Sequence, residues 1–342
     1  MPIELSETIE PQESENSVNL DADQDAKLTK MVKGKALELG FERVGIAPVQ
    51  PSAFKQEYRS WIAGGYAADM DYLKNNIERR LNPSMLLAEA KSIVAVMLNY
   101  YTGPDATDPP ADRALFARYA RGTDYHLVIE KRLKTLARYL SDQAALPVQS
   151  RVYVDTGPIL EREVAQRAGL GWFGKNTMLI NTRLGSYFLL GEIITTASLV
   201  PDRPASGGCG TCTKCMDACP TDAIIAPYQL DSGRCISYLT IEHRGPIPEH
   251  YHRAIGNHVF GCDICQEVCP FNVHRAAPTA DPKMQPRDSV MNRSLAEIVS
   301  LSEDQYRDEF KQSAVKRAKW ADLRRNAMIG LRNLIDSSQA GR

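Results

Sequence analysis

The sequence predicts an α+β protein built from a large N-terminal domain, a cysteine-rich module and a short helical segment. Helix-like and strand-like apolar patterns alternate up to about residue 200. All eight cysteines then lie between Cys209 and Cys269, and a proline-containing linker separates them from the last helices. We place the domains at 1–24 (a disordered acidic tail), 25–200, 201–275 and 276–342.

The first part of the chain is expected to be a tail followed by alternating helices and strands. Residues 1–24 contain no lysine or arginine and show little apolar periodicity, which is typical of disorder. From Asp25 an apolar face predicts a helix, with Gly40 as its stop. Further patterns predict strands at 41–49, 92–99 and 151–154, helices at 133–140 and 159–168, and a strand pair or hairpin at 188–199. The strand at 92–99 is apolar throughout, so it is expected to be central in the sheet.

The cysteines carry the clearest chemical signal. The first four, Cys209, Cys212, Cys215 and Cys219, have the spacing C-x2-C-x2-C-x3-C-P. Bacterial two-cluster ferredoxins bind cubane clusters with this spacing, and their fourth cysteine serves the other cluster. The last three have the spacing C-x2-C-x3-C-P, and Cys235 stands between the two groups. Eight thiolates make two sets of four, as two [4Fe-4S] clusters require.

The spacing further predicts crossed ligation. One set is Cys209, Cys212, Cys215 and Cys269, and the other is Cys219, Cys235, Cys262 and Cys265. Zinc is the main alternative, because paired C-x2-C motifs also bind it. However, a zinc site has no use for the third cysteine at x2 or for Pro220 and Pro270. Disulfides are disfavoured, because the acidic start of the chain does not resemble a signal peptide.

Composition and motifs limit the functional classes. The chain has 342 residues, a net charge of −1 and 43% hydrophobic residues, with no apolar run long enough to span a membrane. We therefore expect a cytoplasmic protein without a membrane partner. The glycine-rich string at 169–175 follows a predicted helix, lacks G-x-G-x-x-G, and is followed by Asn176 where a phosphate loop needs Ser or Thr. Neither NAD nor ATP binding is supported.

Several long strings resemble the epoxyqueuosine reductase family. They are RYARGTDYH (118–126), VDTGPILER (154–162), GLGWFGKN (169–176), CISYLTIEHRG (235–245), GCDICQEVCPFN (261–272), SAVKR (313–317) and LRRNA (323–327). The resemblance extends from about Phe41 to Asn333. Members of this family are cobalamin-dependent enzymes that remove the epoxide oxygen from the modified base at the wobble position of tRNA, the last step of queuosine synthesis.

The resemblance implies a fold, cofactors and partners. It implies a nitroreductase-like corrin-binding domain, a ferredoxin-like module with two cubane clusters, and short C-terminal HEAT-like helices. The expected cofactors are two [4Fe-4S] clusters and cobalamin. The expected partners are the anticodon stem-loop of tRNA with a GUN-type anticodon and an external electron donor, and we expect a monomer. The alternatives are a corrinoid reductive dehalogenase and a non-enzymatic electron carrier.

The resemblance also implies site residues. Asp155 is the candidate acid for the departing oxygen, and burial beside a Gly-Pro turn is expected to raise its pKa. A turn or a helix cap is its structural alternative. The implied corrin contacts are Arg118, Asp155, Leu179, Ser237, Asp263 and Ile264, with a surface charge as the alternative for Arg118 and a core position for Leu179. The string Asp124-Tyr125-His126 matches the lower-ligand motif D-x-H-x-x-G only in part, because Ile129 replaces the glycine.

The C-terminal segment is expected to be helical and basic. Residues 302–305 (SEDQ) predict a capping box that opens a helix. The polar faces carry Lys311, Lys316, Arg317, Lys319, Arg324, Arg325 and Arg332. Such a charge run is usually a solvated helix face, and contact with tRNA phosphates is the functional alternative. His243 and Arg244 are further candidates to face tRNA.

Overall fold

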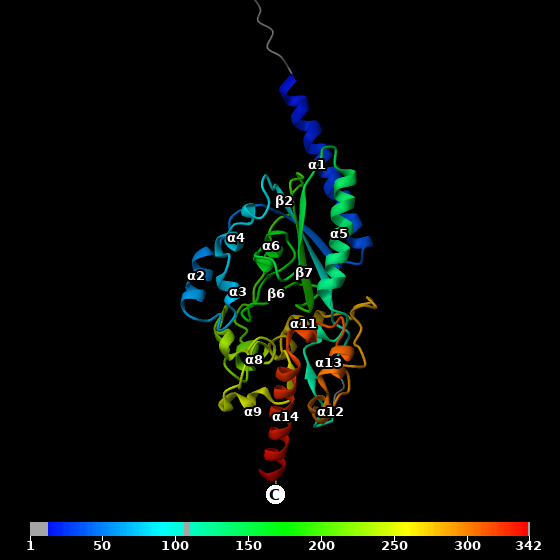
Figure 1. Cartoon of the computed structure of the whole chain (residues 1–342). Helices are drawn as coiled ribbons and strands as arrows, with labels where there is room; N and C mark the ends of the chain where they lie inside the picture. The colour runs from blue at the N-terminus through cyan, green and yellow to red at the C-terminus, as the bar shows by residue number, and fades with distance from the viewer. Residues whose placement is uncertain (1–12, 106–109, 341–342) are drawn as a thin grey trace, which may run out of the picture.

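A four-stranded antiparallel sheet lies at the centre of the N-terminal half, in the order β1-β2-β7-β4 (Figure 1). The computed structural model describes residues 13–105 and 110–340. The strands of the sheet are β1 (Arg43–Pro48), β2 (Ser92–Asn99), β4 (Ser150–Tyr153) and β7 (Phe188–Thr195). The other strands are β3 (Leu115–Phe116), β5 (Trp172–Phe173), β6 (Leu179–Ile180), β8 (Ile224–Ala226), β9 (Gln229–Leu230) and β10 (His258–Phe260).

The helices surround this sheet and build the second half of the molecule. In the first half they are α1 (Glu13–Glu38), α2 (Lys55–Ala63), α3 (Asp71–Lys74), α4 (Ile77–Leu81), α5 (Tyr125–Gln143) and α6 (Glu161–Arg167). In the second half they are α7 (Lys214–Asp217), α8 (Ile236–Ile241), α9 (His252–Ile255), α10 (Ile264–Glu267), α11 (Pro270–Arg275), α12 (Leu295–Ser300), α13 (Glu303–Glu309) and α14 (Trp320–Ala340). Short 3-10 helices are η1 (Pro83–Met85), η2 (Arg118–Ala120), η3 (Ser232–Arg234), η4 (Glu249–Tyr251) and η5 (Ala314–Arg317). None of the helices in the described ranges is long and apolar enough to cross a membrane.

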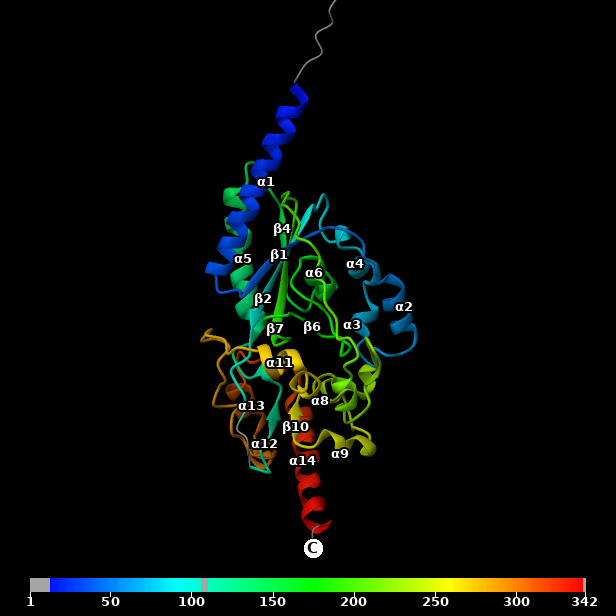
Figure 2. The same cartoon turned by 180° about the vertical axis from the view of Figure 1, so that it is seen from behind.

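Strand β2 is apolar throughout because both of its faces are covered. Val94 and Val96 belong to the core cluster that contains the buried side chains of α1 and α5. Ile93 and Ala95 belong to the second cluster, which contains those of α6. Helices α1 and α5 lie side by side on one face of the sheet and α6 covers the other (Figures 1 and 2). The prediction of a central strand at 92–99 is confirmed.

The close approach of α6 depends on a glycine in β1. A Cβ atom at Gly45 would lie 2.0 Å from the carbonyl oxygen of Ala168, at the end of α6. Any side chain there would force the helix away from the sheet. This packing positions the loop between β4 and α6, which carries Asp155.

Two predictions in the N-terminal half need correction. The first helix begins at Glu13 rather than at Asp25, while residues 1–12 of the predicted tail lie outside the described residues. Once a packed helix has nucleated, each added residue gains a hydrogen bond at little cost, so extension upstream is favourable. The segment at 188–199 forms the single strand β7 rather than a hairpin, because β2 and β4 occupy its two edges.

The C-terminal helices form part of the second half rather than a separate lobe. Helix α14 contacts α12, β10, α9 and α8. The buried amide of Asn326 donates to the carbonyl oxygens of Thr240 and Val259, at 2.9 and 2.8 Å. The capping box at 302–305 is confirmed at the start of α13, and a second box opens α12. Helices α1 and α14 point to opposite ends of the molecule (Figures 1 and 2).

Candidate active site and iron-sulfur centre

All eight cysteines are free thiols. Seven lie in two loops at 209–219 and 262–269, whose helices α7 and α10 contact each other, and Cys235 lies at the start of α8. Cys269 is buried, and it lies close enough to Cys209 and Cys212 for their charges to raise its pKa further. Burial likewise raises the pKa of Cys262, to about 12, with nearby Cys235 and Cys219 contributing. Cys269 thus lies near Cys209 and Cys212, and Cys262 lies near Cys235 and Cys219, while Cys265 has Cys235, Cys262 and Cys215 as neighbours.

The surroundings of these thiols fit cluster ligands. The backbone N–H of Ala223 donates to Sγ of Cys219 at 3.3 Å, and that of Lys175 donates to Sγ of Cys209 at 3.5 Å. Such donors stabilise negative sulfur, and the positive charge of bound iron favours the thiolate over the buried thiol. Within the described ranges, no three His, Cys, Asp or Glu side chains surround one point that would hold a single metal ion. A cubane requires no such point, because each thiolate binds a different iron.

The string GLGWFGKN connects the first domain to both cysteine loops. It forms the β5–β6 hairpin, and Nζ of Lys175 donates to the carbonyl oxygens of Gly210 and Cys212, at 2.8 and 2.9 Å. The side-chain amide of Asn176 donates to the carbonyl oxygen of Cys265 at 3.4 Å. The sequence alone excluded a nucleotide loop here but did not assign these two residues a role.

Asp155 lies in the loop after β4, in a left-handed backbone conformation with φ of 56°. Its side chain is 57% exposed, and Oδ2 lies 3.3 Å from Nε2 of His126. The other ring nitrogen of His126 lies 2.8 Å from Oδ1 of Asp124. The backbone N–H of Asp155 donates to Oε1 of Glu161 at 2.5 Å. The loop is thus held by one contact from α5 and one from α6.

The expected raised pKa of Asp155 is wrong. Burial raises its pKa, but the hydrogen bond and the charge of His126 outweigh burial and hold it below its usual value. Burial also opposes the charge of His126, yet the hydrogen bonds to Asp124 and Asp155 raise its pKa to about 9. At neutral pH the proton of this pair is therefore on His126, and Asp155 is ionised.

Two further carboxyl groups lie behind Asp155. Burial, followed by the charge of Asp155, raises the pKa of Glu161 to about 7. Glu192 in β7 is fully buried, and neither of its carboxyl oxygens has a hydrogen-bond partner within the described part of the chain. Burial and then the charge of Glu161 raise its pKa well above the ordinary value. Glu192 is the one charged residue in the otherwise apolar strand 188–195, and this is the sequence feature that could have revealed the Glu161–Glu192 pair.

Arg118 is buried rather than a surface charge, so that alternative is wrong. Its guanidinium donates to the carbonyl oxygen of Gly103 at 2.8 Å, lies 3.2 Å from Oδ2 of Asp105, and stands over the rings of Tyr101 and Tyr187. Its Nε has no hydrogen-bond partner among the residues described.

The structure brings most of the other expected corrin contacts to the second cysteine set. The backbone N–H of Arg118 donates to the buried carboxylate of Asp263 at 2.7 Å, and Ile264 begins α10. The hydroxyl of Ser237 donates to the carbonyl oxygen of Cys262 at 3.4 Å. Leu179, in contrast, is 2% exposed and belongs to the core cluster on the α6 face of the sheet.

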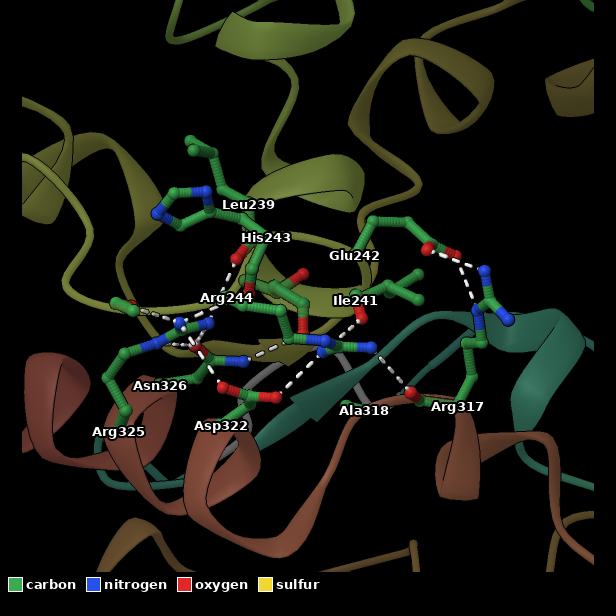
Figure 3. Close-up of polar contacts among 12 residues, drawn as sticks. Leu239, Ile241, Glu242, His243, Arg244, Arg317, Ala318, Asp322, Arg325 and Asn326 are labelled. Atoms are coloured by element: carbon green, nitrogen blue, oxygen red, sulfur yellow. Dashed lines mark hydrogen bonds and ion pairs between the residues drawn. The ribbon is translucent and has the colours of Figure 1, made fainter. Parts of the chain in front are cut away.

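The basic residues of the C-terminal segment divide into two groups. Arg325 donates to the carbonyl oxygens of Leu239, His243 and Gly245, so it links α14 to the loop after α8 (Figure 3). Arg244 pairs with Asp322 at 2.7 Å and Arg317 pairs with Glu242 (Figure 3). Of the other basic residues named from the sequence, five are exposed, namely Lys311, Lys316, Lys319, Arg324 and Arg332. Arg244 and Arg325 thus connect parts of the protein, and the lysines face solvent.

The comparisons with known proteins agree with this arrangement. Residues 208–272 match the model of the 4Fe-4S double cluster binding domain, and residues 80–156 match that of epoxyqueuosine reductase QueG, DUF1730. An epoxyqueuosine reductase of Pseudomonas aeruginosa is 40% identical over 92% of this chain and 88% of its own length. The chain belongs to the epoxyqueuosine reductase family. An epoxyqueuosine reductase of Synechocystis is 46% identical over 84% of this chain and all of its own length.

Solved structures of the same family have this fold. A crystal structure of epoxyqueuosine reductase with an epoxyqueuosine-modified tRNA-Tyr stem loop has a TM-score of 0.85 and 33% identity, covering 91% of this chain and 83% of that one. An epoxyqueuosine reductase from Bacillus subtilis, with its catalytic aspartate loop swung out of the active site, has a TM-score of 0.84 and 32% identity over the same shares. The family resemblance and the expectation of an iron-sulfur module are confirmed.

The crossed sets stay a prediction that one substitution tests. Anaerobically purified protein should contain about eight iron and eight sulfide, the content of two cubanes. Cys219→Ala should damage the cluster of Cys235, Cys262 and Cys265 and leave the other intact, as measured by electron paramagnetic resonance and Mössbauer spectroscopy. Cys215→Ala is the matched control and should damage the other cluster. The opposite pattern would contradict crossed ligation, and zinc without sulfide would contradict both clusters.

Proposed function

We propose that this protein reduces epoxyqueuosine in tRNA to queuosine. The observation that carries the proposal is the 40% sequence identity to an epoxyqueuosine reductase over 92% of this chain. The charged His126–Asp155 pair and the double-cluster module support it. A related structure that contains an epoxyqueuosine-modified stem loop supports tRNA as the carrier of the base. The rival dehalogenase and electron-carrier interpretations lack comparable support.

Two [4Fe-4S] clusters and cobalamin are the cofactors, and an external donor loads the clusters. The cysteine sets would hold the clusters, while Arg118, Asp155, Ser237, Asp263 and Ile264 would line the cobalamin site. The guanidinium of Arg118 is buried beside Asp105, Tyr101 and Tyr187, so Arg118 would support the wall of this site. When bound, cobalamin supplies the reducing centre for the substrate. Both ring nitrogens of His126 face carboxylates, so this side chain would hold a proton there and would not serve as a metal ligand.

The domain assignment follows the same proposal. Residues 25–200 form a nitroreductase-like corrin-binding domain, 201–275 the ferredoxin-like module, and 276–342 a HEAT-like helical segment. The close contact between the β5–β6 hairpin and both cysteine loops supports a short electron path between the first two. The protein acts as a monomer in the cytoplasm.

Proton supply is the task of the protein's own side chains. Removing the epoxide oxygen as water consumes two electrons and two protons and leaves a carbon-carbon double bond. The proton at Nε2 of His126 faces Oδ2 of Asp155 at 3.3 Å, so Asp155 relays it to the departing oxygen. Glu161 accepts a hydrogen bond from the backbone N–H of Asp155 and holds the loop, and the second proton comes from solvent. The proton donor at this site is therefore the His126 imidazolium and not a carboxylic acid whose pKa burial has raised.

The tRNA partner is the anticodon stem-loop with a GUN-type anticodon. The net charge of the whole chain is −1, so contact with RNA phosphates requires a local group of positive charges. The exposed lysines near α14 supply it. Arg325 and Arg244 serve the protein's own packing instead. The binding face therefore includes the region where η5 and the start of α14 meet α8.

The role of Asp155 can be tested by substitution. Asp155→Asn keeps the side-chain shape but cannot relay a proton, so turnover of an epoxyqueuosine-containing stem loop should fall by about a hundredfold or more. Cobalamin binding and cluster reduction, followed by absorption spectra, should be unchanged. Asp142→Asn, at an exposed position on α5, is the matched control. Near-normal turnover of Asp155→Asn would return this residue to a turn-forming role.

The proton on His126 predicts an alkaline limit of activity. Because the pKa of His126 is raised to about 9, the proton is present below this pH and is lost above it. Single-turnover reduction with pre-reduced protein should therefore be constant between about pH 7 and 8 and fall about tenfold per pH unit above pH 9, the behaviour of one titrating acid. In His126→Asn the fall in rate above pH 9, the alkaline limb of the pH profile, should disappear, and the rate should be low at every pH. An unchanged limb in this variant would exclude His126 as its source.

Phosphate contacts at the lysines predict a salt-dependent affinity. The double variant Lys316→Glu, Lys319→Glu should bind the stem loop more weakly, and the slope of log K against log salt should flatten by about one to two. Fluorescence anisotropy over a salt series measures both. Lys30→Glu, on the distant helix α1, should change neither. Identical slopes for all three proteins would remove phosphate binding from this surface.

A further inference from the structure

Three side chains from distant parts of the sequence meet beside Asp155. Tyr72 comes from α3, Glu242 follows α8, and Arg317 ends η5. Nε and one terminal nitrogen of Arg317 donate to the two carboxylate oxygens of Glu242, each at 2.7 Å (Figure 3). The guanidinium carbon lies 5.5 Å from the centroid of the Tyr72 ring. We name Tyr72, Glu242 and Arg317 the Tyr72–Arg317 ledge.

The ledge is rigid and open to solvent. Tyr72 is 46% exposed and the side chain of Arg317 is 53% exposed, whereas that of Glu242 is mostly buried. A bidentate pair fixes the plane of a guanidinium as well as its position. Exposed ion pairs contribute little to stability, so the main effect of Glu242 here is orientation. The result is a preorganised pair in which the guanidinium lies over one face of the Tyr72 ring, while the other side of each group can accept a stacked base.

The ledge borders the proton-supplying pair. Burial, then the charge of Glu242 and also that of Asp155, raise the pKa of Tyr72 to about 12, so its ring is neutral. The charge of Arg317 acts on Asp155 as well, although burial and the contacts with His126 and Tyr125 have the larger effects on the pKa of Asp155. A substrate base that reaches Asp155 therefore brings its neighbours in the RNA close to Tyr72 and Arg317.

We propose that the Tyr72–Arg317 ledge stacks an unpaired base that neighbours the reacting base in the RNA. The inference rests on the proposed function and adds a substrate contact to it. Single-stranded RNA bases are held by stacking on aromatic rings and on guanidinium planes, and the ledge offers both. A phosphate fits less well, because Glu242 already occupies the hydrogen-bonding edge of Arg317 and neutralises its charge. Tyr72 and Arg317 are thus specificity-determining residues rather than part of the phosphate-binding face.

Binding of fluorescent stem loops to the cofactor-loaded full chain tests the ledge without depending on turnover. Tyr72→Ala should weaken binding by about tenfold or more, the range expected for one stacked base, and Tyr72→Phe should bind nearly as wild type. Arg317→Lys keeps the charge but loses the plane, so it should also bind more weakly while the salt slope stays unchanged. Iron content and cobalamin binding verify that each variant is folded.

A stem loop without the neighbouring base identifies the contact. An abasic site directly before or after the reacting base should weaken binding to wild type by the same factor as Tyr72→Ala. Combining that RNA with Tyr72→Ala should cause no further loss, because both changes remove one interaction. Tyr139→Ala is the matched control, since Lys35 lies over its ring at 5.6 Å near the other end of α5. It should bind both RNAs as wild type does.

The outcomes separate the ledge from the proposed function. Full affinity in Tyr72→Ala, or additive losses with both abasic RNAs, would overturn the ledge even if wild type reduces the base normally. Normal binding by Arg317→Lys together with weak binding and a flatter salt slope in Arg317→Gln would make Arg317 a phosphate contact and overturn stacking. If wild type binds the stem loop but does not reduce it, the proposed function fails and the ledge is judged by the binding data. If wild type does not bind the stem loop, the ledge is overturned, and reduction of the free nucleoside then decides the function.

Discussion

The structure depends on the convergence of two cysteine loops that are far apart in the sequence. A cubane accepts its four thiolates at fixed corners, so crossed sets require both loops to be held in one relative position. The β5–β6 hairpin reaches both loops through Lys175 and Asn176, and the backbone of Arg118 is bound to Asp263 in the second loop. Helix α14 fixes the other side of the module through Asn326. The elements around the module are therefore parts of one scaffold for electron transfer.

Electrostatic pairing, rather than burial, governs the acid chemistry beside this scaffold. A carboxyl can retain its proton through desolvation, but Asp155 is more than half exposed and faces a protonated histidine. The proton instead resides on His126, between two carboxylates. Burial does act on the nearby carboxyls, where it raises the pKa of Glu161 to about 7 and that of Glu192 well above its ordinary value. The site thus combines a histidine of raised pKa with two carboxyl groups of raised pKa, Glu161 and Glu192.

The C-terminal segment shows that equal charges can have different tasks. Arg325 and Arg244 satisfy carbonyl oxygens and Asp322 inside the molecule, whereas the lysines face solvent (Figure 3). Arg317 has an intermediate position, because Glu242 orients it while one part of its side chain stays exposed. Guanidinium groups suit the first and third tasks since their planar geometry allows several directed hydrogen bonds. Ammonium groups suit loose contact with phosphates.

The sequence by itself determined the features that local spacing and periodicity encode. The cysteine spacing predicted the cluster module, the apolar run of β2 predicted a central strand, and the residues at 302–305 predicted the start of α13. Tertiary structure alone decided which distant groups meet. The sign of the pKa shift at Asp155, the burial of Arg118 and the union of Tyr72, Glu242 and Arg317 each depend on side chains many residues apart. Charge interactions and desolvation act through space, so their outcome is set by the folded distance and not by the order of residues.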